Sequence, residues 1–348
     1  MTERDVRLPD PGKLVVSSSP HIHDGDSVRR IMLLVIAALT PACITGLIFF
    51  GIRALWVLLV CAGGCVGFEW LFARLMKRPV RISDGSALLT GILLGMNVSA
   101  ATPAWICLVG CFLAIYLGKM LYGGLGYNPF NPALVGRVGL LIAFPGALTT
   151  WVRPVDGLFT WVKPVDAMTT ATPLGTLGVL KSWAPAQVMR MGEGTLSYWD
   201  CAIGHMGGCI GETSALALLA GGLFLIAVRV IRWQIPVAFI GSVFVFTGIA
   251  HAVSPDVYAP PVFHLLVGGL FLGAFFMATD MVTSPMTGVG ALLFGAGCGI
   301  ITCVIRLWGS YPEGVSFSIL IMNAMAPLID RYTGLQPFGA VRSKEATA

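Results

Sequence analysis

The chain has 348 residues, of which 56% are hydrophobic and only 11% are charged. A soluble domain typically carries about 25% charged residues, so this composition excludes an ordinary soluble protein and predicts a polytopic membrane protein. The formal net charge of +5 does not require a nucleic-acid partner, because basic residues gather in the cytoplasmic loops of membrane proteins and contact anionic lipid there.

The polar residues 1–30 come first and are predicted to form a cytoplasmic segment without a cleavable signal. Apolar runs of about 20 residues, the length that a bilayer requires, then follow one another along the chain. They predict an all-α protein with about ten transmembrane helices, at residues 31–51, 55–75, 86–99, 104–122, 132–147, 213–232, 235–254, 262–279, 287–308 and 315–331.

Residues 332–348 form a polar C-terminal tail. Lys and Arg, Lys119 among them, are more frequent in the segments that this topology places inside the cell. Basic residues near membrane ends mark the cytoplasmic side. Both termini are therefore predicted to be cytoplasmic, and loop 148–212 is predicted to be outside.

The predicted helices divide into two halves, 31–147 and 213–331, on either side of this loop. Leu88–Gly95 resembles Leu265–Gly273, which indicates a duplication. Because each half has an odd number of spans, the halves run in opposite directions, as inverted repeats do. Proteins of this kind bind ligands between the repeats, at interrupted helices.

Candidate interruptions are rich in polar residues, glycine or proline, and they lie at 83–85, 123–132 and 279–285. Helix ends there would present free N–H groups to an anion or to the polar edge of a ring. We assign Asn128, Asn131 and Asp280 to a candidate cofactor or ion site on this basis. The alternative is that these segments are ordinary loops and helix caps.

Ionisable residues inside membrane spans are costly and are therefore functional candidates. Glu69 lies well inside the second span, and Arg137 begins the fifth. Arg137 joins the candidate cofactor or ion site, although it or Asp280 could instead close a salt bridge between the halves. Four acidic residues fall near span ends, where ion pairing or contact with water is the simpler account: Asp84, Glu212, Asp280 and Asp330.

The long outer loop contains the motif Asp166-Ala-Met-Thr-Thr-Ala-Thr172. It has the form Asp-x-x-Ser/Thr-x-Ala-Thr, in which a flavin transferase esterifies the phosphate of FMN to the last threonine. We therefore predict covalent FMN on Thr172, with Asp166, Thr169 and Ala171 as residues of the recognition motif. Pro173 favours extended backbone at Thr172, which presents the hydroxyl outward. The alternative is a polar turn in which the threonines cap backbone groups.

The cysteines number nine and lie mostly within the predicted spans. Two pairs have a spacing of four residues, Cys61 with Cys65 and Cys107 with Cys111, and each pair could share one helix face. Buried cysteines usually behave as small hydrophobic residues, and no complete set of four metal ligands is evident in the sequence. A disulfide between Cys201 and Cys209 of the outer loop is permitted but is not decided by the sequence.

Five segments together are specific for one family: Ser17–His23, Asp84–Gly91, Gly123–Ala133, Asp166–Thr172 and Ala278–Pro285. With them the chain resembles, over nearly its whole length, the RnfD/NqrB family of membrane subunits of redox-driven ion pumps. It looks more like the D subunit of the Rnf complex than the B subunit of the sodium-pumping NADH:quinone reductase. Thr170 departs from the glycine of many relatives and stiffens the acceptor segment slightly.

The resemblance implies ten helices in a urea-transporter-like inverted repeat in the bacterial inner membrane. It also implies FMN on Thr172 and a second, non-covalent flavin, riboflavin-like, nearer the cytoplasmic side. The Rnf complex passes electrons between ferredoxin and NAD and couples this to Na⁺ or H⁺ movement. The expected partners are its flavin and iron–sulfur subunits, together with a flavin transferase for maturation.

Two functions of other classes remain open at this point. A small-solute channel could also be built from inverted repeats with interrupted helices, but it would carry no flavin. A purely structural scaffold for neighbouring subunits would tolerate the loss of the Thr172 hydroxyl without a loss of electron transfer.

Overall fold

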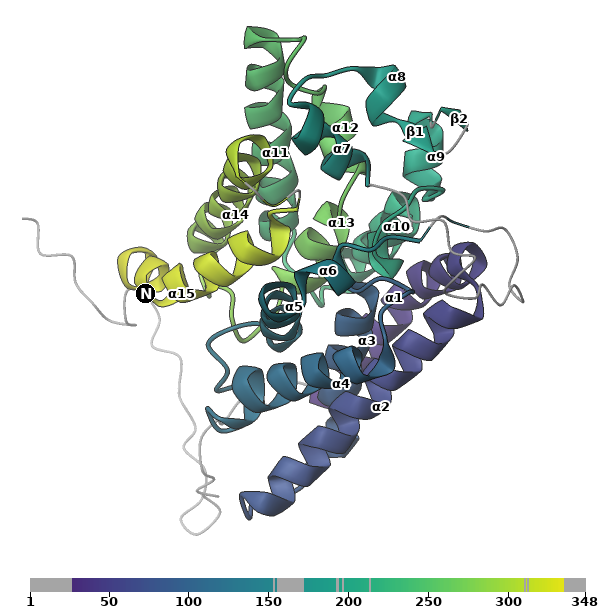
Figure 1. Cartoon of the computed structure of the whole chain (residues 1–348). Coiled ribbons are helices and arrows are strands. Elements are labelled where there is room, and N and C mark those ends of the chain that lie inside the picture. Colours follow the sequence, from purple (N-terminus) through teal and green to yellow (C-terminus); the bar gives the residue numbers. More distant parts are fainter. Residues whose placement is uncertain are drawn as a thin grey trace, which may run out of the picture.

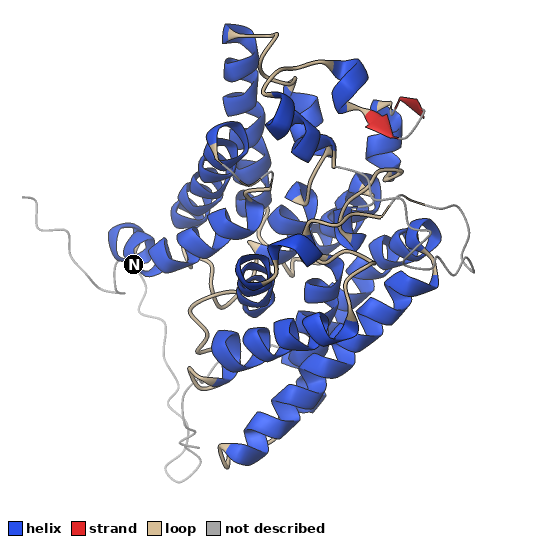
Figure 2. Cartoon of the chain, in the orientation of Figure 1, coloured by secondary structure: helices blue, strands red, loops and turns tan. Residues whose placement is uncertain are grey.

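The computed structural model describes residues 27–152, 154, 172–191, 194–195, 197–212, 214–309, 311 and 313–334. Within these residues the protein is almost entirely helical. Its only strands there are the short antiparallel pair β1 (Arg190–Met191) and β2 (Gly194–Thr195), red in Figure 2. The prediction of a helical architecture is confirmed, with this small hairpin as an addition.

The first half of the chain, purple to blue in Figure 1, contains apolar α-helices, one short 3-10 helix and one π-helix. In chain order the elements are α1 (Val28–Phe50), α2 (Ile52–Leu75), the 3-10 helix η1 (Ile82–Asp84), α3 (Ser86–Met96), α4 (Ala104–Phe112), the π-helix η2 (Leu113–Met120) and α5 (Pro132–Ala143). The π-helix continues α4 without a break in the chain direction.

In the residues that the structure describes, the connection between the halves contains short elements. They are α6 (Pro145–Leu148), α7 (Pro173–Leu180), α8 (Pro185–Val188), the two strands, α9 (Tyr198–Ile203) and the 3-10 helix η3 (Ile210–Glu212). The second half then contains α10 (Ala215–Ala227), α11 (Gln234–Val253), α12 (Pro261–Leu266), α13 (Leu270–Leu272), the π-helix η4 (Gly273–Met277), α14 (Gly288–Trp308) and α15 (Val315–Thr333).

Each segment predicted to span the membrane contains a helix. Among the described residues, four helices are long and apolar enough to cross a bilayer on their own, namely α1, α2, α11 and α14. The other predicted spans hold shorter or less apolar helices. The chain is a multi-pass membrane protein, while the count of ten crossings and the inverted repeat stay predictions.

The two halves are in contact through several helix pairs. Helix α1 packs against α10, and α5 packs against α15. Within the halves, α2 packs against α3 and α4, and α11 packs against α14. Close approach depends on missing side chains: a Cβ atom on Gly295 of α14 would lie 2.6 Å from the carbonyl oxygen of Ile235 in α11. This is the small-residue packing expected where helices associate in lipid.

The predicted interruption at 83–85 overlaps the short helix η1 between α2 and α3, and the other two lie at turns between helices. Gly85 separates η1 from α3 with a left-handed φ of 78°, which only glycine adopts without strain. Residues 121–131 form the turn between η2 and α5, and 278–287 form the turn between η4 and α14. These turns meet around one cavity.

Candidate functional site

A cavity of about 640 Å³ lies between the two halves. Its walls come from α1, the end of α2, the start of α3, the 123–132 turn and the 279–282 turn. Cofactor pockets commonly enclose about 300–1,000 Å³. The predicted interruptions of the two halves therefore combine into one site of cofactor size.

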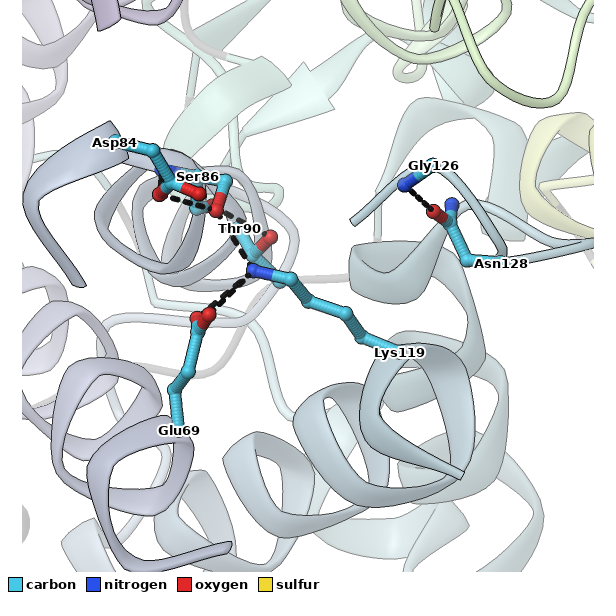
Figure 3. Close-up of polar contacts among 7 residues, drawn as sticks. All are labelled: Glu69, Asp84, Ser86, Thr90, Lys119, Gly126 and Asn128. Atoms are coloured by element: carbon cyan, nitrogen blue, oxygen red, sulfur yellow. Dashed lines mark hydrogen bonds and ion pairs between the residues drawn. The ribbon is translucent and has the colours of Figure 1, made fainter. Parts of the chain in front are cut away.

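The polar end of this cavity is an ion pair inside a hydrogen-bonded network, drawn in Figure 3. The Lys119 Nζ atom lies 2.9 and 2.8 Å from the two carboxylate oxygens of Glu69 and 2.7 Å from the Ser86 Oγ atom. The Ser86 hydroxyl donates to Asp84 Oδ1 at 2.6 Å, and the Ser86 N–H donates to the same oxygen at 2.9 Å. Thr90 donates to the Ser86 carbonyl oxygen at 2.9 Å. Each donor of Lys119 thus has an acceptor.

Lys119 is the residue whose role the sequence did not reveal. It was counted among the basic residues of the inner side, although it lies within the predicted span 104–122, and the residue is buried with 1% exposure. The π-helix accounts for the difference, because its wider turn shifts Lys119 onto the face that meets Glu69 of α2. The i, i+4 spacing of a regular helix does not predict that Lys119 faces Glu69.

Asn128 and Asn131 both line the cavity and both also stabilise turns. The Asn128 side chain accepts from the Gly126 N–H at 3.3 Å (Figure 3) and donates to the Phe130 carbonyl at 3.1 Å. Asn131 caps α5 by accepting from the Ala133 N–H at 3.0 Å. The expected role in turns and caps is therefore confirmed for both residues, whereas their assignment to a cofactor or ion site stays a prediction.

Asn131 also connects the halves, since its amide nitrogen donates to the carbonyl oxygen of Met277 in η4 at 3.1 Å. Asp280 lines the cavity from the second half, and its carboxylate accepts from the Thr283 hydroxyl at 3.2 Å. Three of the residues assigned to the second site, Asn128, Asn131 and Asp280, are thus brought together.

Arg137 is not part of the cavity wall. Its guanidinium pairs with Glu313 in the loop between α14 and α15 at 2.9 Å, and it also donates to the carbonyl oxygen of Asn97. The second half of the chain supplies Glu313, so Arg137 closes a salt bridge between the halves. Glu313 was missed because no motif surrounds it in the sequence.

Two further polar residues, Cys209 and Glu212, lie beside Glu313 of this salt bridge. Cys209, Glu212 and Glu313 each place a ligand atom within 4.8 Å of the others. The Cys209 N–H donates to the Glu212 carboxylate at 3.3 Å, and the Cys209 thiol donates to the Asn97 carbonyl at 3.2 Å. Cys201 and Cys209 are both free thiols, so the outer-loop disulfide is not formed in this structure.

Thr172 is the residue of the flavin motif that the structure describes, whereas Asp166, Thr169 and Ala171 lie outside the described residues. Its side chain caps α7, accepting from the Gly175 N–H at 3.0 Å. It is 7% exposed. Leu174 and Leu177 of α7 belong to a separate apolar cluster that also contains residues of α8, α9 and α12.

Comparison with known proteins gives a consistent result. Residues 15–339 match the model of the NQR2, RnfD, RnfE family. The chain is 45% identical over 328 residues to the D subunit of the proton-translocating ferredoxin:NAD(+) oxidoreductase complex of Clostridium ljungdahlii, covering 94% of this chain and 96% of that one. It is 41% identical over 338 residues to the D subunit of the Na(+)-translocating ferredoxin:NAD(+) oxidoreductase complex of Acetobacterium woodii, covering 96% and 98%.

A third relative is the D subunit of the ion-translocating oxidoreductase complex of Stutzerimonas stutzeri, which is 42% identical over 330 residues and covers 90% and 92% of the two chains. The family match extends over far more than half of the sequence, and these relatives align nearly from end to end. The chain belongs to the NQR2, RnfD, RnfE family.

Proposed function

We propose that this chain is the D subunit of an ion-translocating ferredoxin:NAD⁺ oxidoreductase complex, in which it relays electrons across the membrane through FMN esterified to Thr172. It crosses the bacterial inner membrane about ten times as two inverted repeats, with both termini in the cytoplasm. Its partners are the flavin and iron–sulfur subunits of the same complex, and a flavin transferase matures it. The relatives named above support its assignment as the D subunit.

The observation that carries the flavin assignment is the position of Thr172. The motif ends at the residue that caps α7, where the hydroxyl oxygen faces the Gly175 N–H at 3.0 Å. A phosphoester on that oxygen would be next to the positive end of the α7 dipole, which favours anions. The cap would hold the attached phosphate at a fixed place on the protein. An electron carrier needs this because its cofactor must stay at a fixed distance from the neighbouring redox centres.

The cavity between the halves supports a second, non-covalent flavin. Phe275 and Phe276 of η4 supply apolar wall, while the network of Lys119, Glu69 and Ser86 supplies polar groups at one end. A bound flavin supplies one- or two-electron redox chemistry there. The residues that line the cavity would orient such a ring and exclude water from it, with Ser86 and the Lys119–Glu69 pair at one end. On the proposed topology this site is the one nearer the cytoplasm.

Denaturing gel electrophoresis tests the proposal. Made together with its partners and the flavin transferase, the chain is expected to fluoresce in the gel under ultraviolet light and to copurify with the other subunits. Thr172→Ala is expected to copurify but not to fluoresce. A non-fluorescent wild-type chain with no flavin absorption in the native state would favour the small-solute channel. A Thr172→Ala complex with full electron transfer would favour the scaffold.

A further inference from the structure

Four fully buried cysteines line the contact between α2 and α4, which pack side by side (Figure 1). Cys61 and Cys65 are one turn apart on α2, and Cys107 and Cys111 are one turn apart on α4. The sequence suggested separate small hydrophobic residues. The structure instead turns both pairs toward each other.

The cysteine thiols of α2 face those of α4 at successive turns along the two helices. The thiols of the two helices lie within electrostatic range of one another, Cys61 with Cys107 and Cys111, and Cys65 with Cys111. Cys111 Sγ is also 3.4 Å from the carbonyl oxygen of Cys61. Gly64 permits this approach, since a Cβ atom there would lie 3.1 Å from Cys111 Sγ.

One turn beyond Cys65, α2 carries Glu69, which pairs with Lys119 of η2, the continuation of α4. Both residues belong to the cavity wall. Cys65 is one helical turn from Glu69, a rise of about 5.4–6 Å. The Cys65 thiol also lies within electrostatic range of Glu69 and Lys119. The cysteines therefore form a direct continuation of the polar end of the cavity.

We propose that these cysteines form a redox-active dithiol site, in which facing thiols on α2 and α4 are oxidised to an interhelical disulfide. In each step two S–H bonds break, one S–S bond forms, and two electrons and two protons leave. Oxidised flavin in the adjoining cavity accepts them and becomes the hydroquinone. This oxidant depends on the proposed function. Glu69, one helical turn from Cys65 and within its electrostatic range, is the base that passes the protons toward the cavity.

Charge favours a disulfide over a metal ion at this place. A divalent ion held by four thiolates would leave two negative charges in the membrane interior, and Lys119 is already neutralised by Glu69. Uncompensated charge in an apolar interior is expensive. Conversion of two thiols to a disulfide leaves no net charge. It also needs no cavity, only the close approach that Gly64 provides.

The test is a count of free thiols in two redox states. The purified complex is reduced with dithionite or reoxidised with ferricyanide, then unfolded and alkylated with N-ethylmaleimide. All nine cysteines are expected to be labelled after reduction. Two or four fewer are expected after oxidation, and peptide mapping should show α2 joined to α4. Cys298 and Cys303, which are buried on α14, serve as internal controls and should be labelled in both states.

Variants separate the possible pairs. Every thiol contact described above includes Cys61 or Cys111, so Cys61→Ala combined with Cys111→Ala should abolish the redox-dependent change. Cys61→Ala alone should leave a Cys65–Cys111 disulfide. Mapping of the wild-type protein needs no variant and decides the question even if a variant does not fold.

Oxidation with copper–phenanthroline, which enters membranes, tests the dithiol site without flavin. It should join α2 to α4 in protein that lacks flavin. Full labelling of all cysteines under every oxidising condition would overturn the proposal, and so would a stoichiometric metal ion released from these thiols. Normal flavin content with unchanged thiols would reject the dithiol site alone, whereas absent flavin would reject the proposed function.

Discussion

At the scale of single residues, the buried Glu69–Lys119 pair is the most consequential arrangement. Both side chains are almost fully buried, and the carboxylate accepts two contacts from the ammonium at 2.9 and 2.8 Å. Burial of two charges is stable only when each compensates the other. The pair therefore positions the polar end of the cavity and holds α2 against η2.

Glu69→Gln is expected to leave the Lys119 charge buried without its counter-ion, at a cost of about 3–5 kcal/mol of unfolding free energy. Thermal unfolding in detergent, followed by circular dichroism, measures the change. Glu69→Gln combined with Lys119→Met removes both charges and should recover much of the loss. Equal stability of the wild type and the single variant would show that the pair is not needed.

At the scale of elements, short and irregular helices position the functional groups. The π-helix η2 presents Lys119, the 3-10 helix η1 presents Asp84, and α7 presents Thr172 at its first turn. Helix α7 has eight residues, too few to be stable in isolation. The Thr172 cap and the packing of α7 in the apolar cluster with α8, α9 and α12 therefore decide whether α7 forms.

Thr172→Ala should remove the cap hydrogen bond to Gly175 and destabilise α7 by about 1 kcal/mol, apart from any effect on flavin. Thr172→Ser retains a hydroxyl and should preserve the cap. Hydrogen exchange of the Gly175 amide, compared in flavin-free protein, reports this directly. Exchange about fivefold faster in the alanine variant only is expected from that energy. Identical exchange in all three proteins would contradict the capping role.

At the scale of the whole molecule, the two halves are joined by polar contacts as well as by packed helices. Arg137 pairs with Glu313 at 2.9 Å, and Asn131 donates to Met277 at 3.1 Å. Both contacts cross from the first half to the second. The cavity lies where these halves meet, so its shape depends on their relative placement.

Arg137→Gln should leave Glu313 without its counter-charge and lower the free energy of unfolding by about 3–5 kcal/mol. Arg331→Gln, on the exposed last turn of α15, is the matched control and should change stability by less than about 0.5 kcal/mol. Thermal unfolding of the two variants in one detergent compares them. Similar melting temperatures would mean that the salt bridge does not hold the halves together.

The sequence predicted much of this organisation because membrane helices follow from apolar length, and breaks follow from glycine, proline and polar residues. Of the four residues assigned to one site, Asn128, Asn131 and Asp280 line the same cavity and Arg137 does not, and their binding of a cofactor or an ion stays a prediction. Lys119 could not be placed, because a π-helix changes which residues share a face. Glu313 and the facing cysteines of α2 and α4 were missed for a related reason: they depend on contacts between segments far apart in the chain, which no local pattern encodes.

The covalent flavin on Thr172 can be detected through the intact mass of the purified protein. Protein made in a host with its flavin transferase should be heavier than the sequence by FMN less one water. Thr172→Ala should lose that increment, and Thr170→Ala should keep it. An unmodified wild-type mass in such a host, or an increment that survives Thr172→Ala, would contradict the account.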